Sequence, residues 1–200
     1  MRVEVIKIAR YDPTFGGKYS KYEGYNLSAS EQADPPIVSE ACTEIETSIK
    51  ILQSSVFFHS TLLRGKQTAD CINSLRSAVL IKCPEIKEIP FSMIALLSED
   101  EFVTNGSNLV RQRFTQAFID DRLLEGRNEI KGRITKLLTV LDAMKGEYAS
   151  VGLISHSFFM KILEGVVTDI PVFDVPEKVR DLIRYNQKTY PFGGGFKFEV

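Results

Sequence analysis

The chain has 200 residues, with 25 Lys and Arg against 26 Asp and Glu, so its formal net charge is −1. Without a basic excess, we expect neither nucleic acid nor an anionic membrane surface as a partner. Hydrophobic residues make up 44% and charged residues 26%, which is typical of a soluble globular protein. This length fits a single domain with a sizeable core, so one domain over residues 1–200 is expected.

The three cysteines, Cys42, Cys71 and Cys83, have no metal-ligand spacing and indicate no disulfide framework. That usage favours a reducing compartment. The apolar run at the N-terminus is too short for a signal peptide, and no stretch is long enough to span a membrane. We therefore expect a cytoplasmic protein without a metal or another cofactor.

Short apolar runs rich in β-branched or aromatic residues predict buried strands. These runs cover residues 3–8, 56–58 and 148–154, with a shorter extended piece at 85–91. At the C-terminus, residues 188–192 and 196–200 flank three glycines and predict a hairpin.

Apolar residues spaced three and four apart predict amphipathic helices between these strands. The helical patterns cover residues 36–53, about 61–79, 108–124, 129–145, 158–167 and 179–185. Ser98 is an N-cap candidate before the acidic turn at residues 99–101. Residues 14–30 predict a Gly-rich loop; its tyrosines, with Tyr11 nearby, either form a binding lip or pack the loop down.

Strands that alternate with helices predict an α/β three-layer sandwich, with a mostly parallel sheet and helices on both faces. In such sheets, ligands bind beyond the carboxyl ends of the strands. The side chains expected there follow the predicted strands: Arg10, Tyr11, His59, Arg64, Glu88 and His156.

Arg64 stands in the first turn of the helix after the second strand, where Ser60 and Thr61 offer side-chain oxygens for an N-cap. A cation at this end opposes the helix dipole. Arg64 is therefore either a solvated arginine or, together with the helix N-terminus, one wall of an anion site.

Residues 60–69 resemble the Ser-Pro-x-x-Arg-x-x-x-Thr-Ala motif of the histidine phosphatase superfamily, the phosphoglycerate mutase-like proteins, with Thr61 in place of proline. Residues 151–157 resemble the family's late strand, which ends in a histidine, and residues 86–91 its acidic segment. The helical part at 101–141 is similar to the inserted helices of bacterial members. The resemblance covers most of the chain and implies a phosphoglycerate mutase-like fold.

In that family, two arginines and the late histidine hold a phosphoryl group, an early histidine attacks it, and a glutamate acts as general acid. The resemblance assigns Arg10 and Arg64 as the two arginines and His156 as the late histidine. It assigns Glu88 as the acid, with Glu99 as the fallback.

The early nucleophile does not match, because Tyr11 and Asp12 stand where the family has His-Gly. A tyrosine hydroxyl, with an ordinary pKa of about 10, is a poor nucleophile unless strongly activated. The Asp12 carboxylate would repel a phosphate or neutralise Arg10. We therefore expect a pocket for a small anionic or phosphorylated molecule, in which phosphohistidine chemistry is lost or replaced.

Two alternatives remain open from the sequence. One is an active phosphatase in which His59 or a water is the nucleophile, although His59 fits a structural role better. The other is a non-catalytic interaction protein that docks through its tyrosine-rich loop. The sequence is compatible with a homodimer but does not determine the oligomeric state.

Overall fold

A computed structural model of the chain describes residues 1–184, 187 and 190–200 and contains a five-stranded sheet of order β3-β2-β4-β1-β5. The neighbours among the first four strands pair in parallel, and β5 runs antiparallel to β1 at the edge. The strands are β1 (Arg2–Lys7), β2 (Val56–His59), β3 (Val79–Lys82), β4 (Ser150–Ser155) and β5 (Gly195–Glu199). The mostly parallel sheet expected from the sequence is therefore confirmed.

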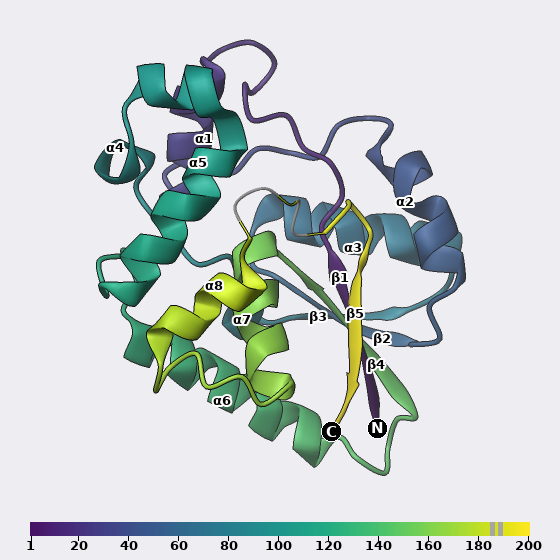
Figure 1. Cartoon of the computed structure of the whole chain (residues 1–200). Helices are drawn as coiled ribbons and strands as arrows, with labels where there is room; N and C mark the ends of the chain where they lie inside the picture. The colour runs from purple at the N-terminus through teal and green to yellow at the C-terminus, as the bar shows by residue number, and fades with distance from the viewer. Residues whose placement is uncertain (185–186, 188–189) are drawn as a thin grey trace.

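Helices cover both faces of the sheet. Successive residues of a strand point to opposite faces, so neighbouring side chains pack against different helices. Phe57 packs with α2 (Ala41–Lys50) and α3 (Leu63–Leu75). Phe58 belongs to the larger core on the other face, with α6 (Arg127–Ala143) and α7 (Ser157–Val167). Figure 1 shows these two helical layers with the sheet between them. The three-layer architecture is confirmed.

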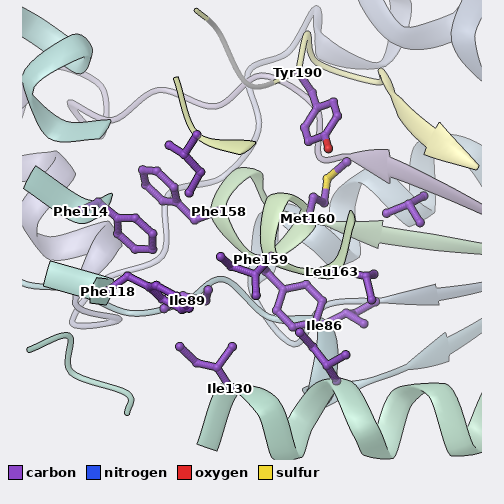
Figure 2. Close-up of a cluster of buried hydrophobic side chains, with 14 of the residues drawn as sticks. Ile86, Ile89, Phe114, Phe118, Ile130, Phe158, Phe159, Met160, Leu163 and Tyr190 are labelled. Atoms are coloured by element: carbon purple, nitrogen blue, oxygen red, sulfur yellow. The ribbon is translucent and has the colours of Figure 1, made fainter. Parts of the chain in front are cut away.

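The larger core is rich in aromatic side chains. Phe114 stacks on Phe158 with 3.7 Å between ring centroids and 10° between planes. Figure 2 shows Phe159 near Ile86 and Leu163, with Ile130 of α6 beneath them. This packing anchors the first turn of α7, which follows directly after β4.

A helix lies where the sequence predicts a loop. The helix α1 (Lys21–Ala29) begins at a capping box in which Ser20 and Glu23 exchange hydrogen bonds. Gly24, which suggested a loop, is needed for close packing, because a Cβ there would lie 1.6 Å from the carbonyl oxygen of Pro13. The helix has almost no amphipathic pattern, so hydrophobic periodicity does not reveal it.

Three further elements differ from the expectation. The helix predicted to reach residue 79 ends at Leu75, and the edge strand β3 follows, with largely exposed side chains that give no alternating pattern. The extended piece predicted at 85–91 instead begins with the 3₁₀ turn η1 (Pro84–Ile86). The helix predicted from residue 36 begins only at Ala41.

The remaining helices frame one end of the sheet. Ser98 caps α5 (Glu99–Ile119) as predicted, in a capping box with Glu101, and the helix is kinked at Gly106, where φ is 58°. The others are α4 (Met93–Leu96), η2 (Pro176–Lys178) and α8 (Val179–Leu182). Residues 185, 186, 188 and 189 of the predicted last helix and hairpin lie outside the described residues; residues 190–194 form no strand, and β5 pairs with β1 instead.

A disulfide joins Cys42 of α2 to Cys71 of α3, which corrects the sequence expectation of no disulfide. The two helices lie on the same face of the sheet, and this proximity, with Cα atoms 5.4 Å apart, is not visible in the spacing of 29 residues. The expectation of a reducing compartment loses its basis in cysteine usage. Among the described residues, no helix has the length and apolar character needed to cross a membrane.

Two glycine variants should change stability in opposite directions. Gly152 of β4 is paired with Phe57, whose ring would lie 2.1 Å from an added Cβ, so Gly152→Ala should destabilise the fold by about 1–3 kcal/mol. Gly132 of α6 has nothing within 4 Å of such a Cβ, so Gly132→Ala should stabilise it by about 0.5–1 kcal/mol. Chemical denaturation measures both values, and equal effects would contradict this packing.

Candidate functional site

A cavity of about 550 Å³ lies at the carboxyl end of the parallel sheet. Four of the side chains predicted for the site line it: Tyr11, Arg64, Glu88 and His156. Helices α1 and α5, which lie beyond this end of the sheet in Figure 1, contribute the opposite wall. The placement agrees with the rule that ligands of α/β sheets bind beyond the carboxyl ends of the strands.

Arg64 is buried, with 3% of its surface exposed, and is not the solvated arginine that the sequence allowed. It lies on the same face of α3 as Thr68, Cys71 and Ile72, one helical turn or two further on. Its Nη1 pairs with the Oδ1 atom of Asp34 at 2.5 Å. Its Nε is buried and has no hydrogen-bond partner among the described residues.

The start of α3 differs from the predicted cap. Leu62 is the N-cap residue and offers no side-chain bond, whereas the Ser60 hydroxyl accepts a hydrogen bond from the Leu62 N–H at 3.2 Å. The Leu63 N–H donates to Asp34, the same carboxylate that pairs with Arg64. One aspartate from the preceding segment therefore caps the helix and balances its buried cation.

His156 is buried and is the N-cap residue of α7. Its Nε2 lies 2.8 Å from the Ser60 hydroxyl oxygen. Burial, together with the charge of Arg64, lowers the pKa of His156 well below its ordinary value. The imidazole is therefore neutral at physiological pH, and the Ser60 hydroxyl, whose oxygen already accepts from Leu62, can donate to Nε2.

Glu88 caps the N-terminus of α7. Its carboxylate accepts hydrogen bonds from the backbone N–H groups of Phe159 at 2.9 Å and Phe158 at 3.2 Å. Burial raises the pKa of Glu88, while these N–H groups oppose the shift. The glutamate thus lines the cavity and also stabilises the helix that carries His156.

Tyr11 places its ring 5.2 Å from the Arg64 guanidinium carbon. Burial raises the pKa of the Tyr11 phenol to about 12, although the charge of Arg64 opposes this shift. The phenol is therefore neutral at physiological pH, and its environment does not activate it as a nucleophile.

Arg10 does not lie where the resemblance implied. Its guanidinium forms an ion pair with Glu44 of α2 on the exposed surface, and it does not line the cavity. Residues 10 and 11 follow a strand, so their side chains point to opposite sides, and the structure turns Tyr11 inward. The expectation that both arginines meet in one pocket is wrong for Arg10.

Asp12 also points away from the cavity. Its carboxylate accepts hydrogen bonds from the backbone N–H groups of Thr14 and Gly16, both at 2.8 Å, and from the Thr14 hydroxyl at 2.7 Å. It therefore orders its own turn and does not line the cavity, and Arg10 is paired with Glu44 and not with Asp12.

Two alternative site residues lie elsewhere. His59 is buried at the end of β2, where its Nδ1 donates to the Ser60 carbonyl at 2.9 Å, and it does not line the cavity. Glu99 accepts a hydrogen bond from Ser20 at 3.0 Å, in the first turn of α5 and outside the cavity.

The tyrosines of residues 14–30 divide between the cavity lining and internal packing, and the binding lip stays a prediction. Tyr25 of α1 lines the cavity beside Tyr11. Tyr22 packs against Phe102 and donates its hydroxyl to the Leu97 carbonyl at 2.7 Å. Tyr19 packs within its own loop, edge-on to Phe15.

Sequence reasoning missed several residues of the site. Asp34 and Lys7 belong to no recognised motif. Arg111 lies in the middle of a long helix, and the sequence does not show that it faces the cavity. Only Ser60 carried a signal, because it belongs to the quoted motif. Among the described residues, no group of three or more His, Cys, Asp and Glu side chains is placed to hold a metal ion.

A sequence profile described as the histidine phosphatase superfamily (branch 1) matches residues 24–180. The chain belongs to the histidine phosphatase superfamily. The matched region includes Arg64, Glu88 and His156, while residues 10–12 lie before it. No curated protein matches the chain in a sequence search.

Solved structures with the same fold include two proteins described as phosphatases. An α-ribazole phosphatase from Shigella flexneri superposes with a TM-score of 0.65 at 17% identity, covering 96% of this chain and 87% of that one. A mycobacterial glucosyl-3-phosphoglycerate phosphatase with VO3 gives 0.62 at 16%, covering 88% and 84%. The protein YhfR from Bacillus stearothermophilus gives 0.59 at 14%, covering 96% and 87%. At these identities the likeness establishes the fold alone.

The buried neutral His156 should make the fold sensitive to mild acid. Because its pKa is lowered on folding, the unfolded chain binds a proton first as the pH falls below about 6.5, and stability is lost in that range. His156→Gln removes this contribution, so its free energy of unfolding should fall less between pH 7 and pH 5 than that of the wild type. Urea denaturation across this range tests it, and parallel curves would contradict a buried neutral histidine.

Proposed function

We propose that this chain is a divergent histidine phosphatase-like protein that binds the anionic group of a small molecule between Arg64 and His156. In this proposal the phosphohistidine chemistry of the superfamily is lost. The anionic group is a phosphate or a carboxylate, which a guanidinium recognises well.

The environment of Arg64 supports anion binding. A buried guanidinium is costly unless its charge and its N–H groups are satisfied. Asp34 supplies one ion pair, but Asp34 is 26% exposed, and the Arg64 Nε remains without a partner among the described residues. An anion in the cavity would complete the coordination of this side chain.

His156 suits the same role. Its imidazole is neutral, so it adds no charge. Because Nε2 accepts a hydrogen bond from Ser60, the neutral ring carries its proton on Nδ1. The Nδ1–H group can therefore act as a hydrogen-bond donor. A neutral donor beside a buried arginine is a suitable pair for holding one oxyanion.

The main support for a loss of phosphohistidine chemistry is that the Tyr11 phenol is protonated. It lines the cavity beside Arg64 in the place that the resemblance assigns to the nucleophilic histidine. With its pKa raised to about 12, the phenol is almost entirely protonated at neutral pH. A protonated phenol attacks phosphorus poorly, whereas the imidazole that it replaces has a free ring nitrogen.

The alternative phosphatase routes have less support. Because His59 is buried and does not line the cavity, nothing favours it as a replacement nucleophile. Burial raises the pKa of Glu88, which would suit a general acid, but a proton donor does not replace the nucleophile that the covalent route of the superfamily needs. Docking of a protein partner and a homodimer both stay predictions from the sequence.

The anion site can be tested with a pair of arginine variants. Arg64→Gln should weaken the binding of inorganic phosphate by about 10- to 100-fold, since hydrogen bonds to a charged group contribute about 1.5–3 kcal/mol. Arg10→Gln is the matched control and should change the affinity by less than about twofold, because Arg10 pairs with Glu44 outside the cavity. Isothermal titration calorimetry measures both; a larger loss with Arg10→Gln would restore the family's assignment and contradict ours.

The loss of phosphohistidine chemistry predicts very low phosphatase turnover. The wild-type chain, assayed with p-nitrophenyl phosphate and a panel of phosphate esters, should show hydrolysis close to the uncatalysed background. Incubation with a substrate followed by acid-sensitive phosphate analysis should detect no phosphoenzyme. Robust turnover that disappears in His59→Ala would overturn the proposal in favour of the alternative nucleophile.

A further inference from the structure

The cavity is larger than an oxyanion needs. Its volume of about 550 Å³ falls within the range of roughly 300–1,000 Å³ for pockets that enclose whole small molecules. A phosphate held by Arg64 and His156 would fill only a small part of it. The remaining walls therefore indicate what kind of molecule carries the anionic group.

Those walls are mainly aromatic and aliphatic. Phe102 and Tyr25 make one aromatic pair, edge-to-face at 5.7 Å, and Phe91 and Phe158 make another at 5.6 Å. Ile8, Ala29, Met93, Val110, Tyr190, Pro191 and Phe192 complete the apolar lining. Three serines, Ser28, Ser107 and Ser157, also line the cavity, so a polar body such as a sugar would find partners for only some of its hydroxyl groups and would leave the others against apolar walls.

The aromatic walls are held in place from behind. Phe158 stacks on Phe114, which is fully buried in the core, and Figure 2 shows the two rings side by side. Tyr22 packs against Phe102 and is itself fixed by its hydrogen bond to the Leu97 carbonyl. The rings therefore offer preorganised faces, which lowers the entropic cost of binding another flat ring.

The charges around the cavity favour an anion over a neutral aromatic molecule. Lys7, Arg64 and Arg111 line it with cationic groups, against the single carboxyl group of Glu88. Burial raises the pKa of Glu88, which lessens its negative charge. The Lys7 ammonium lies 4.4 Å from the Phe192 ring centroid, so cationic and aromatic groups share one wall.

We propose that the ligand is a phosphate ester with an aromatic body, whose phosphate lies at Arg64 and His156 and whose ring lies between the Tyr25–Phe102 and Phe91–Phe158 pairs. This inference rests on the proposed anion site and adds the chemical class of the molecule that it holds. The ring would stack or pack edge-on against faces that an inorganic phosphate cannot reach.

A comparison of three probes on the wild-type chain tests the inference without any variant. Calorimetry should give naphthyl phosphate an affinity at least about tenfold higher than that of glycerol phosphate or inorganic phosphate, which share the same anionic group. Equal affinities of naphthyl phosphate and glycerol phosphate would overturn the aromatic class and leave the proposed anion site standing. If the wild type bound no phosphate at all, the proposed function would fail and the inference with it.

Variants of the apolar wall locate the effect. Phe102→Ala should lower the affinity for naphthyl phosphate by at least about tenfold and leave inorganic phosphate unchanged. Val103→Ala, at the exposed neighbouring residue, is the matched control and should change neither affinity.

Ala29→Phe fills the cavity without removing a ring, so it should exclude naphthyl phosphate even if Phe102→Ala folds poorly. A preference for naphthyl phosphate that survives in Ala29→Phe would overturn the proposed position of the ring.

Discussion

The buried charge of Arg64 is the feature on which the rest of the site depends. The guanidinium is held on one side by Asp34 and on another by the face of Tyr11. Thr68, one turn further along α3, fixes the backbone: its hydroxyl donates to the Arg64 carbonyl at 2.7 Å and accepts from the Ala9 N–H at 2.9 Å. This one hydroxyl ties the helix that carries the cation to the segment that follows β1, which carries Tyr11.

A second helix start faces the first. The backbone N–H groups at the start of α7 are satisfied by Glu88, so the turn that carries His156 does not depend on a ligand for its shape. Ser60 then connects the two helix starts, since it lies before α3 and its hydroxyl meets the His156 ring. The proposed anion site is therefore preorganised by bonds within the chain, which would favour binding.

The sequence predicts best the elements with a periodic apolar pattern and the residues of a recognisable motif. Strand β4 and helices α6 and α7 have clear apolar patterns, and the motif of residues 60–69 led to Arg64. The sequence does not predict which way a side chain points. Arg10 and Tyr11 are neighbours, and the course of the backbone decides which of the two lines the cavity. Helix α1 and strand β3 also escaped, because a helix without an amphipathic face and an exposed edge strand leave no period to detect.

In the proposed function, a phenol at the position that the resemblance assigns to an imidazole would do more than remove a nucleophile. Tyr11 brings an aromatic face to the cavity, with its ring 5.2 Å from the Arg64 guanidinium carbon, while Arg10, which the resemblance assigned to the phosphoryl group, pairs with Glu44 outside the cavity. In the proposed function, the absence of Arg10 and the added aromatic surface would weaken the stabilisation of a transferring phosphoryl group, which needs cations aimed at its oxygens. They also strengthen the contacts available to the body of a bound ester. Under the proposed function, the same position would thus favour recognition of a bound ester over phosphoryl transfer.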